Sequence, residues 1–311
     1  MQLNNEVFED VKADMAPVNA RTGILECGRY SFGIGKRTYI MAIVNATPDS
    51  FSDGGRYNDP EAAIERIRQV IADGADIIDV GGESTRPGYT PVGAEEEMER
   101  VMPIIERAVK EFDIPVSIDT TKFSVADEAV RAGASVINDI WGLHKEPRLA
   151  QLAAGSGAGL VMMHNRSGRG QTGSSHAGID NTGDNIGYNT GDIMADIIKF
   201  LCESIMIAEN AGLPRNRMLI DPGIGFGKTP DQNLDALKRL GELKTLDLPV
   251  LLGTSRKSLI KNVIGGGTDD RLEGTAATAA LGIACGADFI RVHDVREIKR
   301  VCMMTDAIVR R

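Results

Sequence analysis

Apolar and polar positions along the chain repeat a short unit. A helical stretch ends in Gly-Ala, and an apolar, β-branched run follows, as at Gly74-Ala75, Gly133-Ala134, Gly157-Ala158 and Gly286-Ala287. Glycine after a helical stretch supplies the left-handed stop that a helix C-terminus favours. A continuously apolar run is typical of a strand covered on both faces. The unit therefore predicts repeated helix-to-strand connections of a parallel α/β fold.

The pattern as a whole predicts eight strands and eight helices. We expect strands near 39–45, 76–81, 115–119, 135–139, 159–163, 217–221, 249–253 and 288–293. We expect helices near 60–73, 94–111, 122–132, 147–155, 192–211, 231–241, 271–285 and 295–309. Asp59-Pro60 and Thr229-Pro230 each place an N-cap residue before a proline at the first helical position. Eight alternations favour an α/β fold closed as a (β/α)8 TIM-type barrel over an open sheet.

Two segments fall outside this pattern. Residues 24–38 contain short apolar runs with glycine turns, which predict an N-terminal β-hairpin. Residues 165–191 are rich in Gly, Asn, Ser, Thr and Asp, and we expect this long loop after the fifth strand to be mobile. The sequence thus divides into an N-terminal extension (1–23) and a single barrel domain (24–311).

Composition narrows the class of protein. The chain has 311 residues, of which 42% are hydrophobic and 25% charged, and its net charge of −9 argues against a nucleic-acid-binding surface. No apolar run approaches the roughly 20 residues of a membrane span. The N-terminus shows no apolar signal segment. The cysteines lack CxxC or zinc spacing, so we expect reduced thiols in a cytoplasmic protein. They are Cys27, Cys202, Cys285 and Cys302.

Polar and charged residues gather where the predicted strands end. In chain order these ends carry Asn45, Glu83-Ser84-Thr85-Arg86, Asp119, Asn138-Asp139, His164-Asn165, Asp221, Ser255-Arg256-Lys257, and Arg291 with His293. The active sites of (β/α)8 barrels lie at the C-terminal ends of the strands. The convergent polar ends therefore predict a binding pocket at the barrel mouth.

The residue types indicate what this pocket binds. Asp119, Asn138 and Asp221 suit the flat hydrogen bonds of a nitrogen heterocycle, whereas Arg86, Arg291 and His293 suit an anion such as phosphate. Asn45 offers a hard oxygen that suits Mg²⁺. No nucleophile–base pair of the usual kind is present among these residues.

Several of these residues also have an ordinary structural interpretation. A lone Asp at a strand end is more often a helix cap or turn residue, and we expect Asp79 and Asp139 to belong to that class. His164 follows two methionines at the end of an apolar run, which favours a structural role. Arg291 and His293 alternate on one strand and so share a face. That arrangement is costly inside a protein unless the pair meets an anion or an acid.

The segment GIGFGKT (223–229) is similar to a phosphate-binding P-loop, but its spacing is wrong. That motif needs a glycine five residues before Gly227, where this chain has Pro222. Thr229-Pro230 also predicts a helix that starts after Lys228, whereas a P-loop lysine lies in the first turn of its helix. We therefore expect no nucleotide site here.

Taken together, the strand-end segments resemble dihydropteroate synthases. They are IMAIVNATPDSFSDGG (40–55), IIDVGGESTRPG (77–88), SIDT (117–120), INDIWG (137–142), MHNR (163–166), DPGIGFGKT (221–229), TSRKS (254–258) and RVHDV (291–295). They follow the family's order, and the resemblance spans residues 24–309. Two departures stand out: Ala46 replaces the expected valine, and the polar stretch 165–191 is longer than in the family.

The resemblance implies a pterin-binding barrel with a defined transferase reaction in folate biosynthesis. That reaction condenses 6-hydroxymethyl-7,8-dihydropterin diphosphate with p-aminobenzoate and yields 7,8-dihydropteroate and pyrophosphate. It also implies a requirement for Mg²⁺, competition by sulfonamides for the p-aminobenzoate site, and a homodimer formed through helices of the outer ring.

The resemblance further implies a role for each matching residue. Pterin contacts would be Asp119, Asn138, Asp221 and Lys257. Diphosphate contacts would be Thr85, Arg86, Arg291, His293 and, through Mg²⁺, Asn45. The p-aminobenzoate site would be bordered by Phe51, Thr85, Pro87, Phe226 and Ser258. The catalytic residues would be Asp119, Lys257, Arg291 and His293.

Two other functions stay open at this point. A methyltetrahydrofolate-type methyltransferase would share the carboxylate and Asn contacts to pterin, but it has no use for the SFSDGG, STRPG, SRKS and RVH segments. A catalytically silent pterin-binding paralogue should have lost one or more charged strand-end residues, all of which are present here. Pterin binding without product formation would distinguish the silent paralogue.

Overall fold

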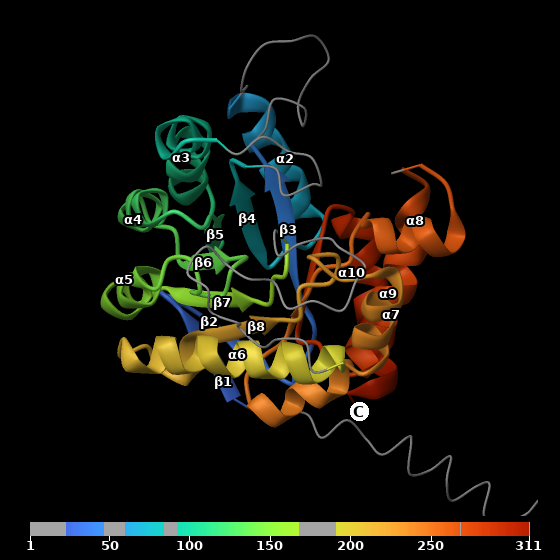
Figure 1. Cartoon of the computed structure of the whole chain (residues 1–311). Coiled ribbons are helices and arrows are strands. Elements are labelled where there is room, and N and C mark those ends of the chain that lie inside the picture. The colour runs from blue at the N-terminus through green and yellow to red at the C-terminus, as the bar shows by residue number, and fades with distance from the viewer. Residues whose placement is uncertain (1–22, 47–59, 84–91, 168–190, 268, 311) are drawn as a thin grey trace, which may run out of the picture.

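Eight parallel strands, ringed by helices, form the centre of the molecule (Figure 1). The computed structural model describes residues 23–46, 60–83, 92–167, 191–267 and 269–310. The barrel strands are β3 (Tyr39–Asn45), β4 (Ile77–Gly81), β5 (Val116–Asp119), β6 (Val136–Asp139), β7 (Gly159–Met163), β8 (Met218–Asp221), β9 (Leu251–Leu252) and β10 (Phe289–Val292). An antiparallel hairpin, β1 (Gly23–Cys27) and β2 (Tyr30–Ile34), precedes them. The predicted α/β barrel with an N-terminal hairpin is confirmed.

Helices follow the strands around the ring. They are α2 (Pro60–Ala72), α3 (Ala94–Glu111), α4 (Phe123–Arg131), α5 (Arg148–Ser156), α6 (Ile193–Asn210), α7 (Pro230–Lys238), α8 (Ser258–Ile264), α9 (Leu272–Ala284) and α10 (Val295–Val309). Short 3-10 turns are η1 (Arg215–Arg217), η2 (Leu240–Leu246) and η3 (Asp269–Arg271). Each described helix is too short or too polar to span a membrane.

The strand order closes the ring. It runs β8-β7-β6-β5-β4-β3-β10-β9, so the first and last barrel strands along the chain, β3 and β10, lie side by side. A parallel bridge between Ile220 and Val250 then joins β8 to the segment that leads into β9. The C-terminal ends of all eight strands consequently meet at one end of the barrel.

Two elements near β9 differ from the prediction made from the sequence. The predicted strand 249–253 contracts to two residues, because the Asp288 side chain accepts the hydrogen bond of the Val250 backbone N–H at 3.1 Å. The short helix α8 was not predicted. Its 7 residues make only about two turns, a window too short to show a helical period.

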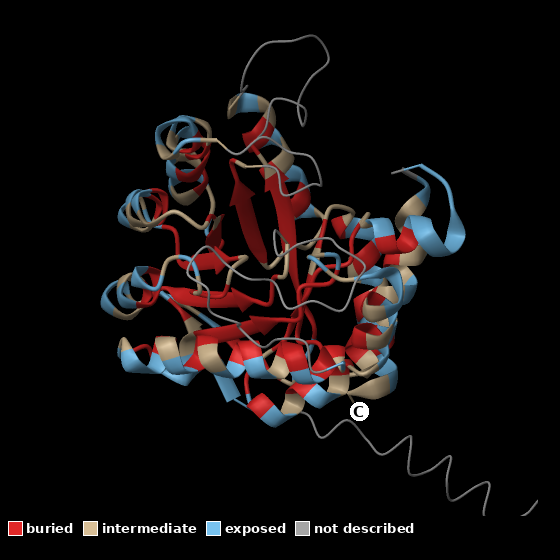
Figure 2. Ribbon diagram, viewed as in Figure 1, coloured by how far each residue is buried: buried red, intermediate tan, exposed pale blue. Residues whose placement is uncertain are grey.

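Alternate residues of the strands enter two separate apolar clusters, as the period of a strand requires. Outward residues such as Ile40 and Ala42 pack under the helices, whereas inward residues such as Met41 fill the barrel. Figure 2 shows the buried strands enclosed by helices that are exposed only on their outer faces. The hairpin closes the N-terminal end of the barrel with Leu25, Cys27, Phe32 and Ile34.

Towards the C-terminal ends, the barrel interior becomes polar. Four buried polar residues lie there, beyond the inward apolar side chains that fill the barrel: Asp79, Ser117, Asn138 and Asp221. Buried polar groups of this kind need hydrogen-bond or ionic partners. The fold therefore places a group of buried polar side chains at the barrel mouth.

Two predicted segments lie largely outside the described residues. They are the N-terminal extension 1–23, of which the structure describes only Gly23, and the loop 165–191, of which it describes 165–167 and 191. The predicted domain boundaries and the predicted mobility of the loop stay predictions.

Candidate active site

Strand register aligns four residues across the barrel mouth. Asn45 of β3 pairs with Gly81, Gly81 pairs with Asp119 of β5, and Asp119 pairs with Asn138 of β6. Gly81 contributes no side chain to this row, and a Cβ added there would lie 3.4 Å from the Cβ of Asp119. The glycine therefore leaves room around the Asp119 carboxylate, with Asn45 and Asn138 in the same row.

Arg291 connects this row to the strands on the other side of the ring. From β10, its Nε donates to Asp79 Oδ2 at 2.6 Å and its Nη2 donates to Asp119 Oδ2 at 2.7 Å. Asp79 also accepts a 3.1 Å hydrogen bond from Asn138 Nδ2. The prediction that Asp79 is a cap or turn residue is wrong, because its position in the middle of β4 points it into the barrel. Asp139, in contrast, accepts the backbone N–H groups that follow it, so its interpretation as a turn residue is confirmed.

Burial sets the electrostatics of this cluster. Desolvation raises the pKa of Asp119 to about 7; Arg291 opposes the shift and Asp79 adds to it. Desolvation alone would lower the pKa of Arg291, but Asp79 and Asp119 outweigh it, so the net pKa is raised. Arg291 therefore keeps its charge, whereas Asp119 can hold or release a proton near neutral pH.

A second group of charges surrounds Asp221 at the end of β8. Burial raises the pKa of Asp221, with Lys257 opposing, and burial lowers the pKa of Lys257 to about 8, with Asp221 opposing. The Lys257 ammonium donates to the Ile224 carbonyl and lies 4.6 Å from the centre of the Phe226 ring. This cation–π contact brings Lys257 and Phe226 together beside Asp221.

Lys228, which was not among the predicted site residues, lies beside this group. Its ammonium donates to the Gly223 carbonyl at 2.7 Å, and burial holds its pKa well below the usual range, with Asp221 opposing. Thr229 forms a capping box with Gln232 at the start of α7, so the helix begins after the lysine, as predicted. Lys228 thus braces the loop that carries Phe226.

The loop after β9 is held in a strained conformation. Arg256 has a positive φ of 56°, an uncommon value for a residue with a side chain. Its guanidinium pairs with Asp294, and its carbonyl accepts from Arg271 Nη1 at 2.5 Å. These contacts fix the backbone that precedes Lys257, so the strain serves to direct that side chain.

His293 follows β10 and is held by the neighbouring strand end. Ser255 Oγ lies 3.0 Å from its Nδ1 and accepts from its backbone N–H at 3.2 Å. Arg66 of α2 donates to the His293 carbonyl at 2.6 Å. His164, in contrast, is buried and packs edge-on against Phe200, with 5.0 Å between the ring centroids. This contact agrees with its structural interpretation.

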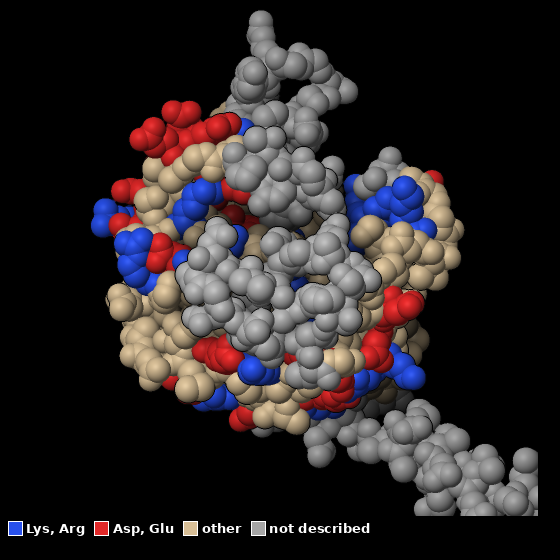
Figure 3. Space-filling view, viewed as in Figure 1, with Lys and Arg blue, Asp and Glu red and all other residues tan. Residues whose placement is uncertain are grey.

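The structure places the predicted site residues that it describes at the strand ends, in the loops after them or, for Ser258, at the start of α8. These are Asn45, Asp119, Asn138, Asp221, Phe226, Lys257, Ser258, Arg291 and His293. Phe51, Thr85, Arg86 and Pro87 lie outside the described residues. On the face drawn in Figure 3, acidic and basic side chains of the described residues are interspersed, with basic ones gathered near α8.

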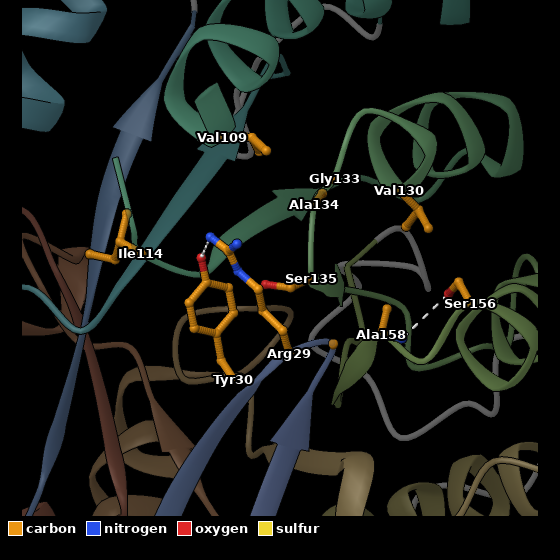
Figure 4. A pocket seen from close by; sticks show the side chains of 11 residues that line it. Arg29, Tyr30, Val109, Ile114, Val130, Gly133, Ala134, Ser135, Ser156 and Ala158 are labelled. Carbon is orange, nitrogen blue, oxygen red and sulfur yellow. Dashed lines mark hydrogen bonds between the residues drawn. The ribbon is translucent and has the colours of Figure 1, made fainter. Parts of the chain in front are cut away.

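A separate pocket lies at the opposite end of the barrel (Figure 4). Arg29 and Tyr30 of the hairpin turn line it together with Ser135 and Ala158, which precede β6 and β7. Arg29 donates to the Tyr30 hydroxyl at 2.7 Å and to Asp113 at 2.8 Å. Barrel enzymes do not carry their chemistry at this end, so the pocket is not the active site.

The mouth therefore combines heterocycle-binding acceptors with fixed cations inside a (β/α)8 barrel. Residues 41–293 match the family described as pterin binding enzymes, and the chain belongs to that class. It is 50% identical over 288 residues to the dihydropteroate synthase of Clostridium beijerinckii, an alignment that covers 92% of this chain and 100% of that protein.

Solved structures agree. A dihydropteroate synthase from Clostridium difficile, solved in the presence of pteroic acid, shares 46% identity with a TM-score of 0.80 over 89% of this chain and 98% of that one. The Yersinia pestis enzyme in a sulfonamide drug complex shares 36% identity, also with a TM-score of 0.80, over 92% of this chain and 99% of that one. Within the pterin-binding enzymes, the chain belongs to the dihydropteroate synthases.

Asp119→Asn tests the electrostatics of the mouth. Because the folded pKa of about 7 lies above the ordinary value of 3.8, the folded protein holds this proton more tightly than the unfolded chain. The stability that the group contributes is therefore lost as the pH rises from about 4 to about 7. Thermal unfolding should show the variant gaining stability relative to wild type across that window, with little further gain above it. A difference that does not vary with pH would contradict the assignment.

Gly223→Ala tests the loop that carries Phe226. At Gly223 a Cβ would lie 1.8 Å from the His164 carbonyl oxygen, and φ is +65°. The variant should lose about 2–5 kcal/mol of stability through overlap and left-handed backbone together. Gly212→Ala is the matched control, since its φ is +83° but no atom lies within 4 Å of the added Cβ. It should lose only about 1–2 kcal/mol in denaturant unfolding. Equal losses would contradict the overlap.

Proposed function

We propose that the dihydropteroate synthase reaction of this chain takes place in the polar row at the barrel mouth, with Arg291 as its central cation. The observation that carries the proposal is the pair of charge-assisted hydrogen bonds from Arg291 to Asp79 and Asp119. They hold a cation at the strand ends without removing its charge. Such preorganised charge suits a reaction whose leaving group is an anion.

We infer that Asp119, Asn138, Asp221 and Lys257 bind the pterin. Three of them end neighbouring or nearby strands, and Lys257 reaches towards Asp221 from the loop after β9. A carboxylate such as Asp221 accepts two parallel donors of an amino-pyrimidinone edge, and an ammonium donates to a ring oxygen or nitrogen. The buried position of these groups strengthens each hydrogen bond.

The diphosphate would lie beside Arg291 and His293, with Thr85 and Arg86 as further contacts from outside the described residues. Mg²⁺ fits here only as part of a metal–diphosphate complex. Within the described part of the chain, no cluster of three His, Cys, Asp or Glu side chains could hold a metal by itself. Asn45 supplies one hard oxygen, and Mg²⁺ in proteins usually takes one or two such ligands plus substrate phosphates and water. The bound ion would neutralise charge on the departing pyrophosphate.

We propose that p-aminobenzoate binds above Lys257, between Phe226 and Ser258. Phe226 is half-buried and Ser258 is exposed, so this site is more open than the pterin site. Phe51, Thr85 and Pro87 would complete it from outside the described residues. The Yersinia pestis complex supports sulfonamide competition for the same site in this chain.

The chain needs no general base in this mechanism. An arylamine is neutral and nucleophilic near pH 7, so the difficult step is cleavage of the bond between the pterin methylene carbon and the diphosphate oxygen. An electron-rich dihydropterin supports positive charge on that methylene, which makes an SN1-like path plausible. Arg291 and His293 would stabilise the departing pyrophosphate, and ionised Asp119 would stabilise the cation. The amine then attacks the methylene and loses a proton to solvent.

Arg291→Ala and Ser258→Ala should damage different steps. Arg291→Ala removes a charge that acts on the leaving group, so kcat/KM for the pterin diphosphate should fall on the order of 10²–10³-fold. Ser258→Ala should mainly raise the KM for p-aminobenzoate. Steady-state kinetics with each substrate varied in turn separates the two effects. Near-native turnover by Arg291→Ala, or a change confined to pterin affinity in Ser258→Ala, would overturn the respective role.

We also propose a cytoplasmic homodimer formed through α9 and α10. These helices pack against each other, and their outer faces expose Leu281, Met303, Met304 and Ile308, each 48–64% accessible. An exposed apolar face of this kind commonly marks a protein interface. All four cysteines are free thiols, which supports a reducing compartment.

Leu281→Glu combined with Met304→Glu should convert the dimer to a monomer, because each buries a charge in the proposed interface. Met206→Glu is the control, since Met206 is 60% accessible but lies on α6. Sedimentation equilibrium should report a monomer for the double variant and a dimer for the control and the wild type. A monomeric wild type, or an intact dimer in the double variant, would contradict this interface.

A further inference from the structure

Asp79 is a buried charge to which the resemblance assigns no role. It lies in the middle of β4 with 0% exposure, and its Oδ2 accepts from both Arg291 Nε at 2.6 Å and Asn138 Nδ2 at 3.1 Å. One oxygen thus binds two of the side chains proposed to contact the substrate, although Asp79 is more fully buried than either. A carboxylate in such a place is costly unless its partners need it.

The chemistry of the three groups fixes how they are arranged. An ionised carboxylate only accepts hydrogen bonds, a guanidinium only donates them, and an amide has one donor end and one acceptor end. Because Asp79 faces Nδ2, the Oδ1 atom of Asn138 is turned away from it. Asn138 lies next to Asp119 in the row at the mouth. Its acceptor end is thereby offered to a ligand N–H group.

The same carboxylate fixes Arg291. Asp79 holds the Nε edge of the guanidinium, and Asp119 holds Nη2 at 2.7 Å. Two carboxylates on neighbouring strands set the plane of a flat cation, which lysine could not reproduce. If Asp79 were an amide, its oxygen could still accept from both donors, but it would carry no formal charge, so both hydrogen bonds would lose their charge assistance.

We propose that Asp79 is a positioning residue for substrate recognition, which directs the acceptor end of Asn138 towards the pterin and holds the guanidinium of Arg291 in the plane that meets the diphosphate. This inference rests on the proposed roles of Asn138 and Arg291. It predicts that pterin affinity depends on which side chain of the pair, at position 79 or 138, donates the hydrogen bond and which accepts it. A polar group at position 79 would not be sufficient by itself.

The test compares five variants, Asn138→Ala among them, by calorimetric binding of 6-hydroxymethyl-7,8-dihydropterin, with melting temperature as the measure of folding. Asp79→Asn should lower affinity by roughly 10-fold or more, the usual scale for a hydrogen bond to a charged group. Asn138→Asp should also lower it, since two carboxylates then face each other. The double variant Asp79→Asn/Asn138→Asp reverses the pair, so the new amide donates to the new carboxylate, whose other oxygen is again an acceptor for the ligand, while Arg291 Nε loses its carboxylate acceptor. It should recover the part of the lost affinity that depends on the pair, but not the part that depends on Arg291.

Asp76→Asn is the matched control. Asp76 precedes β4 at the opposite end of the barrel and accepts from Arg37 at 2.6 Å and 3.0 Å and from the Ile40 backbone N–H at 2.8 Å. Its loss removes a comparable arginine–carboxylate pair, so it should reduce stability and leave pterin affinity unchanged. A purely structural Asp79 would behave in the same way.

The outcomes separate the inference from the proposed function. Unchanged pterin affinity in folded Asp79→Asn, while Asn138→Ala is impaired, overturns the positioning role alone. Unchanged affinity in Asn138→Ala overturns the pterin contact of Asn138, and the positioning role falls with it. A double variant that folds but binds no better than Asp79→Asn overturns the directed-amide argument.

Discussion

Arg291 is held by two carboxylates inside the barrel, and the arrangement of the mouth depends on this contact. Breaking a buried ion pair by removing one partner typically costs about 3–5 kcal/mol, since the other charge is left uncompensated. Asp79 and Asp119 approach Arg291 from strands that lie two and three places away in the sheet. The three side chains therefore link opposite parts of the ring. They also place fixed charge where the strands end and where a barrel enzyme binds its substrate.

The rest of the interior accommodates this charge by separating apolar from polar positions along the barrel axis. The hairpin closes one end with Leu25 and Phe32, and the inward side chains next to it are apolar. Towards the other end the inward positions become Asp79, Asn138 and Asp221. Charges held in this way need no reorganisation when a diphosphate departs, which is the condition for electrostatic catalysis. A reaction that needs no general base is consistent with a site built from hydrogen-bond partners and cations.

Sequence patterns predicted most of the fold because its determinants are local. Gly-Ala followed by an apolar run marks four of the helix-to-strand connections, and the ends of the predicted strands mark Asp119, Asn138 and Asp221 as site candidates. Asp79 was misinterpreted because its partner Arg291 is 212 residues away, and period alone does not reveal a contact across a barrel. The bracing role of Lys228 was missed for a similar reason, since its acceptors are backbone carbonyls. The roles assigned to all of the site residues stay predictions, and Phe51, Thr85, Arg86 and Pro87 also lie outside the described residues.

Pyrophosphate release from 6-hydroxymethyl-7,8-dihydropterin diphosphate in the presence of Mg²⁺, measured with and without p-aminobenzoate, tests the central claim most directly. The account predicts release that depends on the amine, with 7,8-dihydropteroate as the product, and a loss of that release on the order of 10²–10³-fold in Arg291→Ala. Tight pterin binding without amine-dependent release would contradict it, because the charges at the mouth would then bind the substrate without promoting departure of its leaving group.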